Sequence, residues 1–309
     1  MDSILIKSPA TVANLSCGFD ILGICLQRPY DEIEIKIIPS KKIIINSIDS
    51  EFSKIPTIPN QNTGGIPALQ IQSDYSLNFG FEINIKKGIP LCGGLGSSAA
   101  TAAGVTYGIN KLLGDKLSQD EMIKYALEGE KLSSNDPHAD NIGPCLMGGL
   151  VLIKDIRPPN LIQLPIGDFY FSIIHPFVEI ETKLAREVLP SKVDLKICVK
   201  QWGNIASLVY GFVSNDRLLI KQSMIDSIVE PFRSKLIPGY EDVKKSALKL
   251  GSLGCCISGS GPSIFAISEN KEIAQKVLHG MEKALQKNHI EYHSYISSIN
   301  HSGIKVKKS

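Results

Sequence analysis

Alternation of apolar and polar residues predicts a sheet in the first part of the chain. Residues 31–38 and 81–86 alternate with a period of two, as half-buried strands do. Residues 4–6 are predicted to form a first short strand, and residues 42–46 are predicted to be the partner of residues 31–38. Residues 9–23 are dense in small and polar side chains, and this segment is predicted to be a loop. A short helix is expected over residues 66–71.

Helical periodicity begins after residue 97. One helix is predicted over residues 98–113 and ends at Gly114. A second begins at Ser118, where a serine three residues before a glutamate forms a capping box. This helix carries Glu128 and Glu130 at its C-terminal end, where negative charge opposes the helix macrodipole. A functional reason for one of the two is therefore expected.

The second part of the chain mixes strands and helices and is predicted to be α+β. Three prolines in residues 157–165 indicate a domain boundary, which divides the chain into domains 1–160 and 161–309. Strands are expected over 151–153, 169–174 and 291–296, and a glycine turn lies between two strand-like runs in 254–267. The predicted helices cover residues 182–188, 199–213, 217–228, 240–250 and 271–285.

A glycine-rich segment, residues 87–104, joins a predicted strand to a predicted helix and reads KGIPLCGGLGSSAATAAG. Gly93, Gly94 and Gly96 can adopt backbone angles that turn consecutive N–H groups toward an anion. The small residues that follow open the first helical turn to a polyphosphate. An ordinary strand-to-helix connection is the alternative. The Gly-Lys-Ser/Thr sequence of a Walker loop is not present.

Composition excludes several classes of function. Hydrophobic residues at 43% and charged residues at 21% describe an ordinary soluble globular protein. A formal net charge of +2 gives no reason to expect a nucleic-acid or membrane partner. The seven cysteines lack CxxC spacing, so we expect reduced thiols in a cytoplasmic protein. Neither a leader sequence nor a membrane-spanning run is recognisable.

Two further segments carry candidate functional groups. Asn14 and Asp20 lie in the predicted loop 9–23 and could present an amide and a carboxylate to a ligand, although both residue types also stabilise turns. His138, Asp140 and Asn141 lie within four residues of each other. The histidines are scattered along the chain, so a zinc site is not expected.

These motifs together resemble the small-molecule kinases named after galactokinase, homoserine kinase, mevalonate kinase and phosphomevalonate kinase. The three motifs read PATVANLSCGFD, PLCGGLGSSAA and SGSGPS, and the resemblance spans nearly the whole chain. Within that superfamily, Ala-Asn-Leu-x-x-Gly-Phe-Asp, His-Ala-Asp-Asn, Thr-Lys-x-Ala-Arg and Arg-x-Lys-Leu-Ile-Pro resemble the homoserine kinase family specifically. Their occurrence in this order makes the combination specific.

The resemblance implies an α+β, two-domain small-molecule kinase fold. Its N-terminal α/β domain would be of the type shared with a ribosomal small-subunit protein, and its C-terminal domain would be ferredoxin-like. The active site would lie between the two domains. The implied reaction is ATP-dependent phosphorylation of the side-chain hydroxyl of L-homoserine, a step of threonine biosynthesis. A homodimer is also a family expectation.

The resemblance also assigns roles to residues of this chain. Mg²⁺ would be held by Ser98 and Glu130, which form the catalytic set together with Asn141. Gly259, Ser260 and Gly261 would form a supporting glycine turn. The expected ATP-binding residues are Asn62, Lys87, Pro90, Leu91, Cys92, Gly93, Gly94, Leu95, Gly96, Ser97, Ser98, Ala99 and Ala100. The expected homoserine-binding residues are Asn14, Asp20, His138, Asn141, Thr182, Arg186 and Arg233.

The implied mechanism does not depend on a strong base. In mevalonate-kinase-like relatives an aspartate is proposed to take the hydroxyl proton, and the residue we align with it here is Asn141, an amide. We therefore expect Asn141 to orient the substrate hydroxyl, with Asp140 as the rival base. Arg186 or Arg233 would grip the substrate carboxylate, and Asp20 would hold its ammonium group.

Two other functions remain open on sequence alone. A sister kinase could act on mevalonate or a sugar, but an aspartate with two arginines favours an amino acid. A catalytically silent sensor could bind the ligand without turnover, but it would not need the Ser98 and Glu130 pair.

Overall fold

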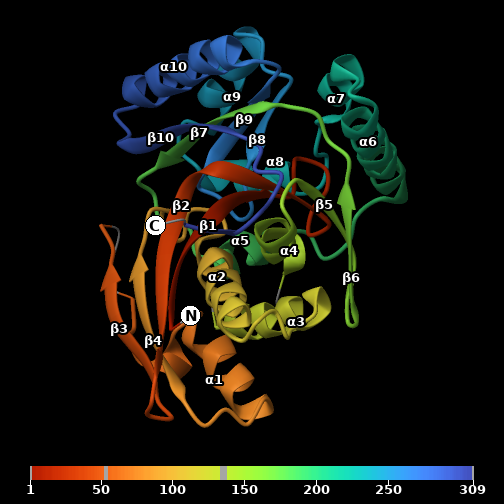
Figure 1. The fold of residues 1–309 in the computed structure, drawn as a ribbon. Helices are drawn as coiled ribbons and strands as arrows, with labels where there is room; N and C mark the ends of the chain where they lie inside the picture. The colour runs from red at the N-terminus through yellow and green to blue at the C-terminus, as the bar shows by residue number, and fades with distance from the viewer. Residues whose placement is uncertain (1, 52–54, 133–137, 308–309) are drawn as a thin grey trace.

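Two sheets organise the chain (Figure 1). The computed structural model describes residues 2–51, 55–132 and 138–307. The first sheet has the strand order β11-β1-β2-β4-β3, and its β5–β6 hairpin branches from β2. Its strands are β1 (Ser3–Ala13), β2 (Leu22–Ile38), β3 (Ile43–Asp49), β4 (Gly80–Lys86), β5 (Leu150–Ile156), β6 (Pro159–Leu164) and β11 (Lys305–Val306). The β3–β4 pair is parallel, and the other pairs are antiparallel.

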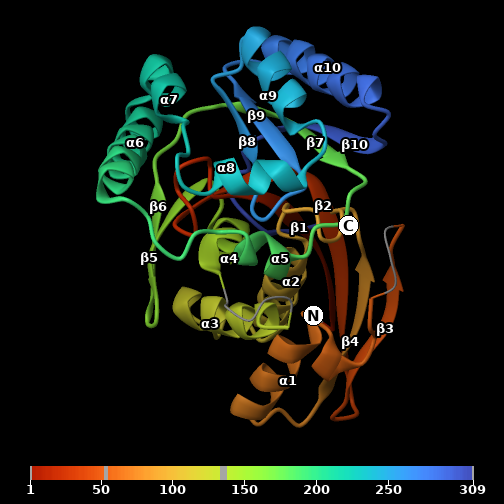
Figure 2. The same ribbon diagram turned by 180° about the vertical axis from the view of Figure 1, so that it is seen from behind.

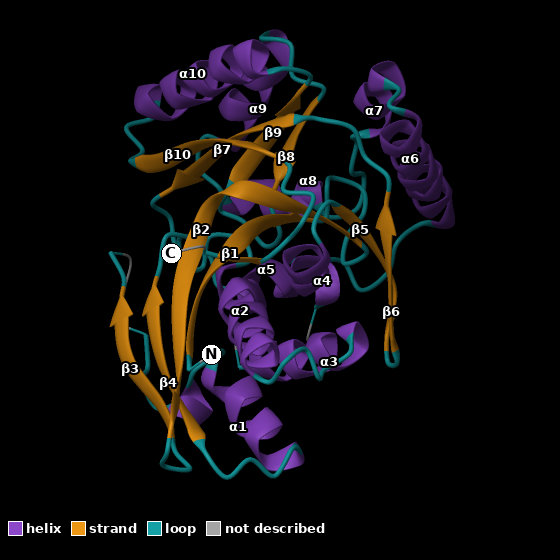
Figure 3. Cartoon of the chain, in the orientation of Figure 1, coloured by secondary structure: helices purple, strands orange, loops and turns teal. Residues whose placement is uncertain are grey.

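Helices cover one face of this sheet (Figure 3). They are α1 (Gly65–Asp74), α2 (Ser97–Leu112), α3 (Gln119–Glu130) and α4 (Ala139–Met147), with a short 3-10 helix at Pro59–Gln61. Small residues let α2 approach the sheet closely, because a Cβ at Gly104 would lie 2.6 Å from Cδ1 of Ile33. The predicted capping box is confirmed. The hydroxyl of Ser118 accepts from the N–H of Glu121, and the carboxylate of Glu121 accepts from the N–H of Ser118.

The second sheet is antiparallel, with the order β10-β7-β9-β8. Its strands are β7 (Tyr170–Pro176), β8 (Gly254–Ile257), β9 (Ile264–Ser268) and β10 (Tyr292–Ser298). The helices α9 (Tyr240–Lys249) and α10 (Lys271–Lys287) pack on it, and α5 (Thr182–Glu187) and α8 (Glu230–Arg233) lie between the two sheets (Figure 2). The remaining helices are α6 (Leu195–Ser214), α7 (Arg217–Ser223) and a 3-10 turn at Ser234–Leu236.

Two predicted boundaries in the N-terminal part are wrong. The first strand continues to Ala13 and the second begins at Leu22, so the loop expected over residues 9–23 is reduced to residues 14–21. Residues 8–13 are buried on both faces of the sheet, and their side chains therefore show no alternation. In the second half, the helix expected over residues 217–228 ends at Ser223.

The domain boundary expected over residues 157–165 overlaps a strand, because residues 159–164 form β6 and pair with β5. Pro159 is the first residue of that strand, a position that tolerates the missing N–H. The division at residue 160 therefore falls inside a hairpin, and β11 returns to the first sheet. We propose a boundary within residues 165–169 instead. Within the described ranges, no helix is long and apolar enough to cross a membrane.

Candidate active site

The glycine-rich segment forms the loop between β4 and α2, at the wall of a cavity of about 580 Å³. Gly94 and Gly96 have φ of 71° and 68°, a left-handed conformation that favours glycine. Gly96 is the N-cap of α2, so the first N–H groups of this helix follow it directly. The loop therefore has the backbone geometry that was predicted for binding an anion.

The second half of the chain holds this loop from one side. The hydroxyl of Ser258 donates to the carbonyl oxygen of Gly94 at 2.6 Å, and the N–H of Ser263 donates to that of Gly93 at 3.2 Å. Any Cβ at Gly94 would lie 2.1 Å from the carbonyl oxygen of Ser258. The turn expected at residues 259–261 thus lies beside the phosphate loop and helps to position it.

Lys87 holds the loop from below. Its ammonium group contacts the carboxylate of Asp31 and donates to the carbonyl oxygen of Ser97 at 3.0 Å and to the hydroxyl of Thr101 at 2.9 Å. Asp31 also accepts from the N–H groups of residues 88 and 89. These contacts use the three ammonium protons of Lys87, so its position favours a role in supporting the loop over a contact with ATP.

The two residues expected to hold a metal ion lie together. The hydroxyl of Ser98, in the first turn of α2, donates to Oε1 of Glu130 at 2.7 Å. Glu130 is the last residue of α3, and both side chains line the cavity. This placement accounts for a glutamate at an otherwise unfavourable helix end.

Asn141 and Asp140 stand at the start of α4, beside the phosphate loop. The hydroxyl of Thr11 donates to Oδ1 of Asn141 at 2.6 Å, and Nδ2 of Asn141 donates to Asp140 at 3.3 Å. Burial, together with the charges of Asp20 and Glu130, raises the pKa of Asp140 to about 7. The preceding residues 133–137 lie outside the described part of the chain.

Asp20, Arg186 and His138 form a cluster that also lines the cavity. Nη2 of Arg186 donates to both carboxylate oxygens of Asp20, at 2.9 and 3.1 Å, and contacts the ring of His138. The ring of Phe19 lies 5.4 Å from Cζ of Arg186 and 5.0 Å from Cζ of Arg233. About a third of the Asp20 and Arg186 side chains is exposed, so the pair can be reached from the cavity.

Arg233 and Asn14 mainly hold the walls together. Nε of Arg233 donates to the carbonyl oxygen of Ala185, and Nη1 donates to that of Gly259. Burial and the neighbouring Arg186 lower the pKa of Arg233 to about 10, so it remains charged at neutral pH. Nδ2 of Asn14 donates to the same Gly259 oxygen at 3.0 Å. Their predicted contacts with the substrate remain predictions.

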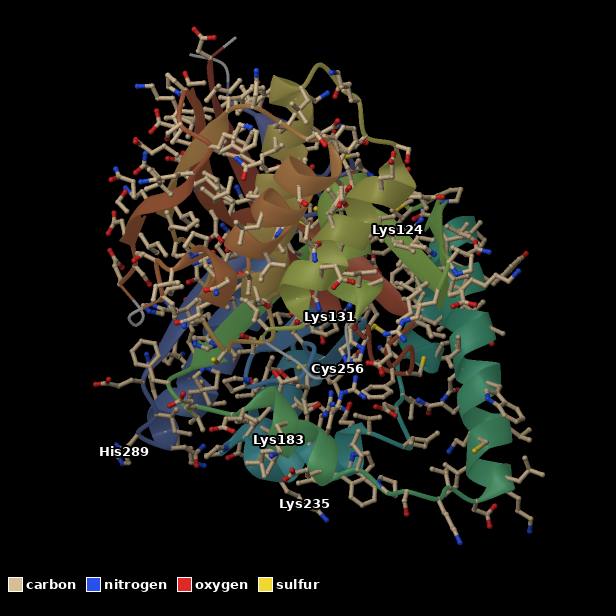
Figure 4. The ribbon with its side chains drawn as sticks, turned by 90° about the horizontal axis from the view of Figure 1, so that it is seen from below. Lys124, Lys131, Lys183, Lys235, Cys256 and His289 are labelled. Carbon is tan, nitrogen blue, oxygen red and sulfur yellow. The ribbon has the colours of Figure 1, made fainter. Side chains whose placement is uncertain are left out.

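The other expected residues fall into two groups. Those that line the cavity are Leu91, Cys92, Gly93, Gly94, Gly96, Ser97, Asn62, Thr182 and Ser260. Pro90, Leu95, Ala99 and Ala100 are buried behind the loop, where only their backbone could serve a nucleotide. Asn62 uses its amide to bind the backbone at Pro56 and Gly64. Lys183 on α5, labelled in Figure 4, also lines the cavity.

Sequence reasoning missed the residues that act through others. Asp31 was assigned only to an alternating strand, and nothing in that pattern distinguishes it from a surface carboxylate. Thr11 was placed in a loop, because the length of the first strand was underestimated. Phe19 stands inside the Gly-Phe-Asp of the first motif, and that position is the one signal that could have identified it.

Comparisons with known proteins agree with this geometry. A family model described as "GHMP kinases N terminal domain" matches residues 66–149, and one described as "GHMP kinases C terminal" matches residues 208–287. Together they cover more than half of the chain. A mevalonate kinase structure from L. major has a TM-score of 0.74 at 13% identity over 95% of this chain and 94% of its own, a likeness of fold alone.

More similar proteins narrow the class. A homoserine kinase of Chlorobium phaeobacteroides strain BS1 is 38% identical over 96% of this chain and 97% of its own length. A homoserine kinase of Methanococcus maripaludis strain C5 is 38% identical over 88% of this chain and 90% of its own length. The crystal structure of a homoserine kinase from Cytophaga hutchinsonii is 45% identical, with a TM-score of 0.96 over 99% and 98%. The chain therefore belongs to the GHMP kinases and, within them, to the homoserine kinase family.

The contact between Gly94 and Ser258 predicts a strong effect of Gly94→Ala. The added methyl group would collide with a backbone carbonyl, and the loop would have to move. A displacement of about 1 Å at a catalytic loop costs roughly 10²-fold in kcat/KM. Gly114→Ala is the matched control, because Gly114 has φ of 78° but open space around its Cβ. It should lose about 1–2 kcal/mol of stability from backbone strain and keep its kcat/KM. Equal kcat/KM in the two variants would contradict the assigned contact.

The raised pKa of Asp140 predicts a pH-dependent change in stability. Because this pKa is about 7 in the fold and near 3.8 in the unfolded chain, folding favours the protonated form. Stability from this group is fully present below pH 4 and is lost as the pH rises to about 7. At pH 8, Asp140→Asn should therefore increase the unfolding free energy by about 1–3 kcal/mol relative to wild type, which raises Tm. At pH 4 the two proteins should differ little. Asp168→Asn, at a side chain that is 94% exposed, is the control. A lower Tm for Asp140→Asn at pH 8 would refute the prediction.

Proposed function

We propose that this protein transfers the γ-phosphoryl group of ATP to the side-chain hydroxyl of L-homoserine, forming O-phospho-L-homoserine for threonine biosynthesis. One observation carries the proposal: a charged pair suited to an amino acid shares a cavity with a phosphate loop. The relatives named as homoserine kinases over nearly the whole chain support it.

The substrate would bind as a zwitterion. Asp20 and Arg186 already pair with each other, so each has its opposite charge satisfied before substrate arrives. A bound amino acid would place its ammonium group on Asp20 and its carboxylate on Arg186, keeping both charges compensated. Thr182 lines the same cavity at the start of α5, and His138 contacts Arg186 from α4. A neutral sugar would leave the charged pair unused.

ATP would place its phosphates on residues 93–98 and its base toward the apolar end of the cavity. That end is lined by Ile48, Ile55, Pro56 and Ile85. The Ser98 hydroxyl and the Glu130 carboxylate fit Mg²⁺, because both are oxygen donors at the phosphate loop. When bound, Mg²⁺ would neutralise charge on the phosphates. The chain's own contribution is to position both substrates and to direct the N–H groups of the loop at the transferring group.

Asn141 would orient the substrate hydroxyl. Thr11 donates to Oδ1 of Asn141 and one N–H of Nδ2 is donated to Asp140, so the second N–H of Nδ2 remains to contact the substrate oxygen. Asp140 is a poor base in this account, because its side chain is buried and paired with Asn141. The phosphoryl transfer would therefore depend on orientation and charge stabilisation, and the hydroxyl proton would leave late.

Two further properties belong to the proposal. The protein would act in the cytoplasm and would form a homodimer. A sister kinase for mevalonate or a sugar and a catalytically silent sensor remain the competing functions.

A coupled ADP-release assay tests the function directly. Purified protein with Mg-ATP should turn over L-homoserine and show no turnover with mevalonate, galactose or no acceptor. The Asp20 and Arg186 pair is the physical reason, because it recognises an amino acid. Turnover of mevalonate or galactose at a comparable rate would establish a sister kinase. Folded protein that binds ATP without any turnover would favour the sensor.

Two variants test the proposed mechanism. Glu130→Ala should lower kcat by roughly 10³-fold, because a group at the transferring phosphoryl is lost. Asp140→Asn should lower kcat by less than about tenfold, since positioning is kept. Both are measured at saturating L-homoserine and Mg-ATP. A larger loss in Asp140→Asn than in Glu130→Ala would assign the proton removal to Asp140.

A further inference from the structure

The outward face of α6 is an exposed apolar stripe, hereafter the α6 stripe. Its residues recur at spacings of three or four, which places them on one side of the helix. They are Leu195, Val199, Trp202, Gly203, Ala206, Tyr210 and Val213. Leu195 is 68% exposed, Trp202 58% and Tyr210 66%. A surface helix normally carries charged or polar residues on this side, and none of these seven is charged.

The inward face of α6 is also apolar. Leu208 and Phe212 are buried, and the rings of Phe212 and Phe169 pack edge to face. A helix that carries apolar residues on two opposite sides normally packs against a partner on each side. In the described part of the chain α6 packs against α7, and Figure 1 shows it at the edge of the molecule. Figure 4 shows side chains of this helix that point away from the rest of the structure.

Gly203 gives the α6 stripe a second unusual property. Glycine inside a helix is unfavourable relative to alanine. A Cβ at this position would meet nothing within 4 Å, so no contact inside the described chain requires a glycine. The close approach of another helix would require one. Ala206 lies one turn further along the same side and is also exposed, so two small residues stand at the centre of the stripe.

We propose that the α6 stripe packs antiparallel against the same stripe of a second copy of this chain, about a two-fold axis between residues 204 and 205. In this arrangement Gly203 faces Ala206 of the partner subunit, and Val199 faces Tyr210 of the partner subunit. The small residues let the helices approach at the centre, and the large side chains pack on either side of them. The proposed function already includes a homodimer. The assignment of the α6 stripe as its interface rests on the residues of α6, and does not require that the protein is an active kinase.

Charge favours the antiparallel direction. Lys196 and Lys200 both lie in the first half of α6, so an antiparallel pair keeps the lysines of the two copies at opposite ends. Lys196 then lies near the C-terminal end of the partner's helix, where the helix dipole is negative and the exposed Asp216 follows. A parallel pair would place all four lysines together.

The dimensions also suit a dimer. A helix of 20 residues is about 30 Å long. Leu218 on α7, 64% exposed, extends the apolar surface beyond the helix. A stable interface buries about 800 Å² on each partner. The apolar surface of α6 together with Leu218 on α7 is of that order of area.

Trp202 is the only tryptophan of the chain, so its fluorescence reports on this surface alone. Sedimentation of the wild-type protein at micromolar concentration should give a dimer mass. On dilution, the Trp202 emission should shift to the red with the same midpoint as the loss of dimer. A monomer at every concentration would overturn the proposal, and so would a dimer whose Trp202 emission is that of an exposed side chain.

Tyr210→Glu tests the same surface without altering the probe. The buried carboxylate should weaken the dimer by about tenfold or more and shift the Trp202 emission to the red. Leu248→Glu is the matched control, because Leu248 lies on α9 and is 41% exposed in wild type. It should leave the dimer affinity and the Trp202 emission unchanged. Circular dichroism should show that both variants are folded. A Tyr210→Glu protein that dimerises as wild type does would also overturn the proposal. Turnover of L-homoserine is measured separately, so loss of the dimer and failure of the proposed function are distinguished.

Discussion

The contact between the phosphate loop and the turn after β8 is the constraint on which the rest of the site depends. Gly93 and Gly94 belong to the second motif, PLCGGLGSSAA, but are held by Ser258 and Ser263, more than 160 residues later in the chain. Asn14 and Arg233 bind the same turn through the carbonyl oxygen of Gly259. The cavity therefore exists only when the two sheets are packed together, and neither half of the chain could form it alone.

Charge organises the cavity in two separate places. Lys87 and Asp31 are buried under the loop, where each compensates the other and both bind the backbone around them. Asp20 and Arg186 are paired at the open wall and partly exposed. A buried pair of the first kind supports the loop and would be costly to break. An accessible pair of the second kind can exchange its partner for the charges of a substrate.

The sequence predicted the elements that carry strong local signals. The loop glycines, the capping box at Ser118 and the helix after Gly96 follow from short-range rules, and the structure confirms them. The length of β1 could not be predicted, because a strand buried on both faces has no alternation. The three prolines of residues 157–165 indicated a domain boundary, although an edge strand can begin with proline, as β6 does at Pro159. The roles of Asp31 and Thr11 arise from contacts 56 and 130 residues away, which no local pattern contains.

In the proposed function, the Asp20 and Arg186 pair selects a zwitterionic substrate. The most direct test compares kcat/KM for L-homoserine and for γ-hydroxybutyrate, which lacks the ammonium group, in wild type and in Asp20→Asn. The account predicts that wild type prefers L-homoserine by roughly 10²-fold or more, because γ-hydroxybutyrate leaves a carboxylate without its partner. In Asp20→Asn the preference should fall to about tenfold or less. An unchanged preference in Asp20→Asn would contradict the claim and place ammonium recognition on another residue.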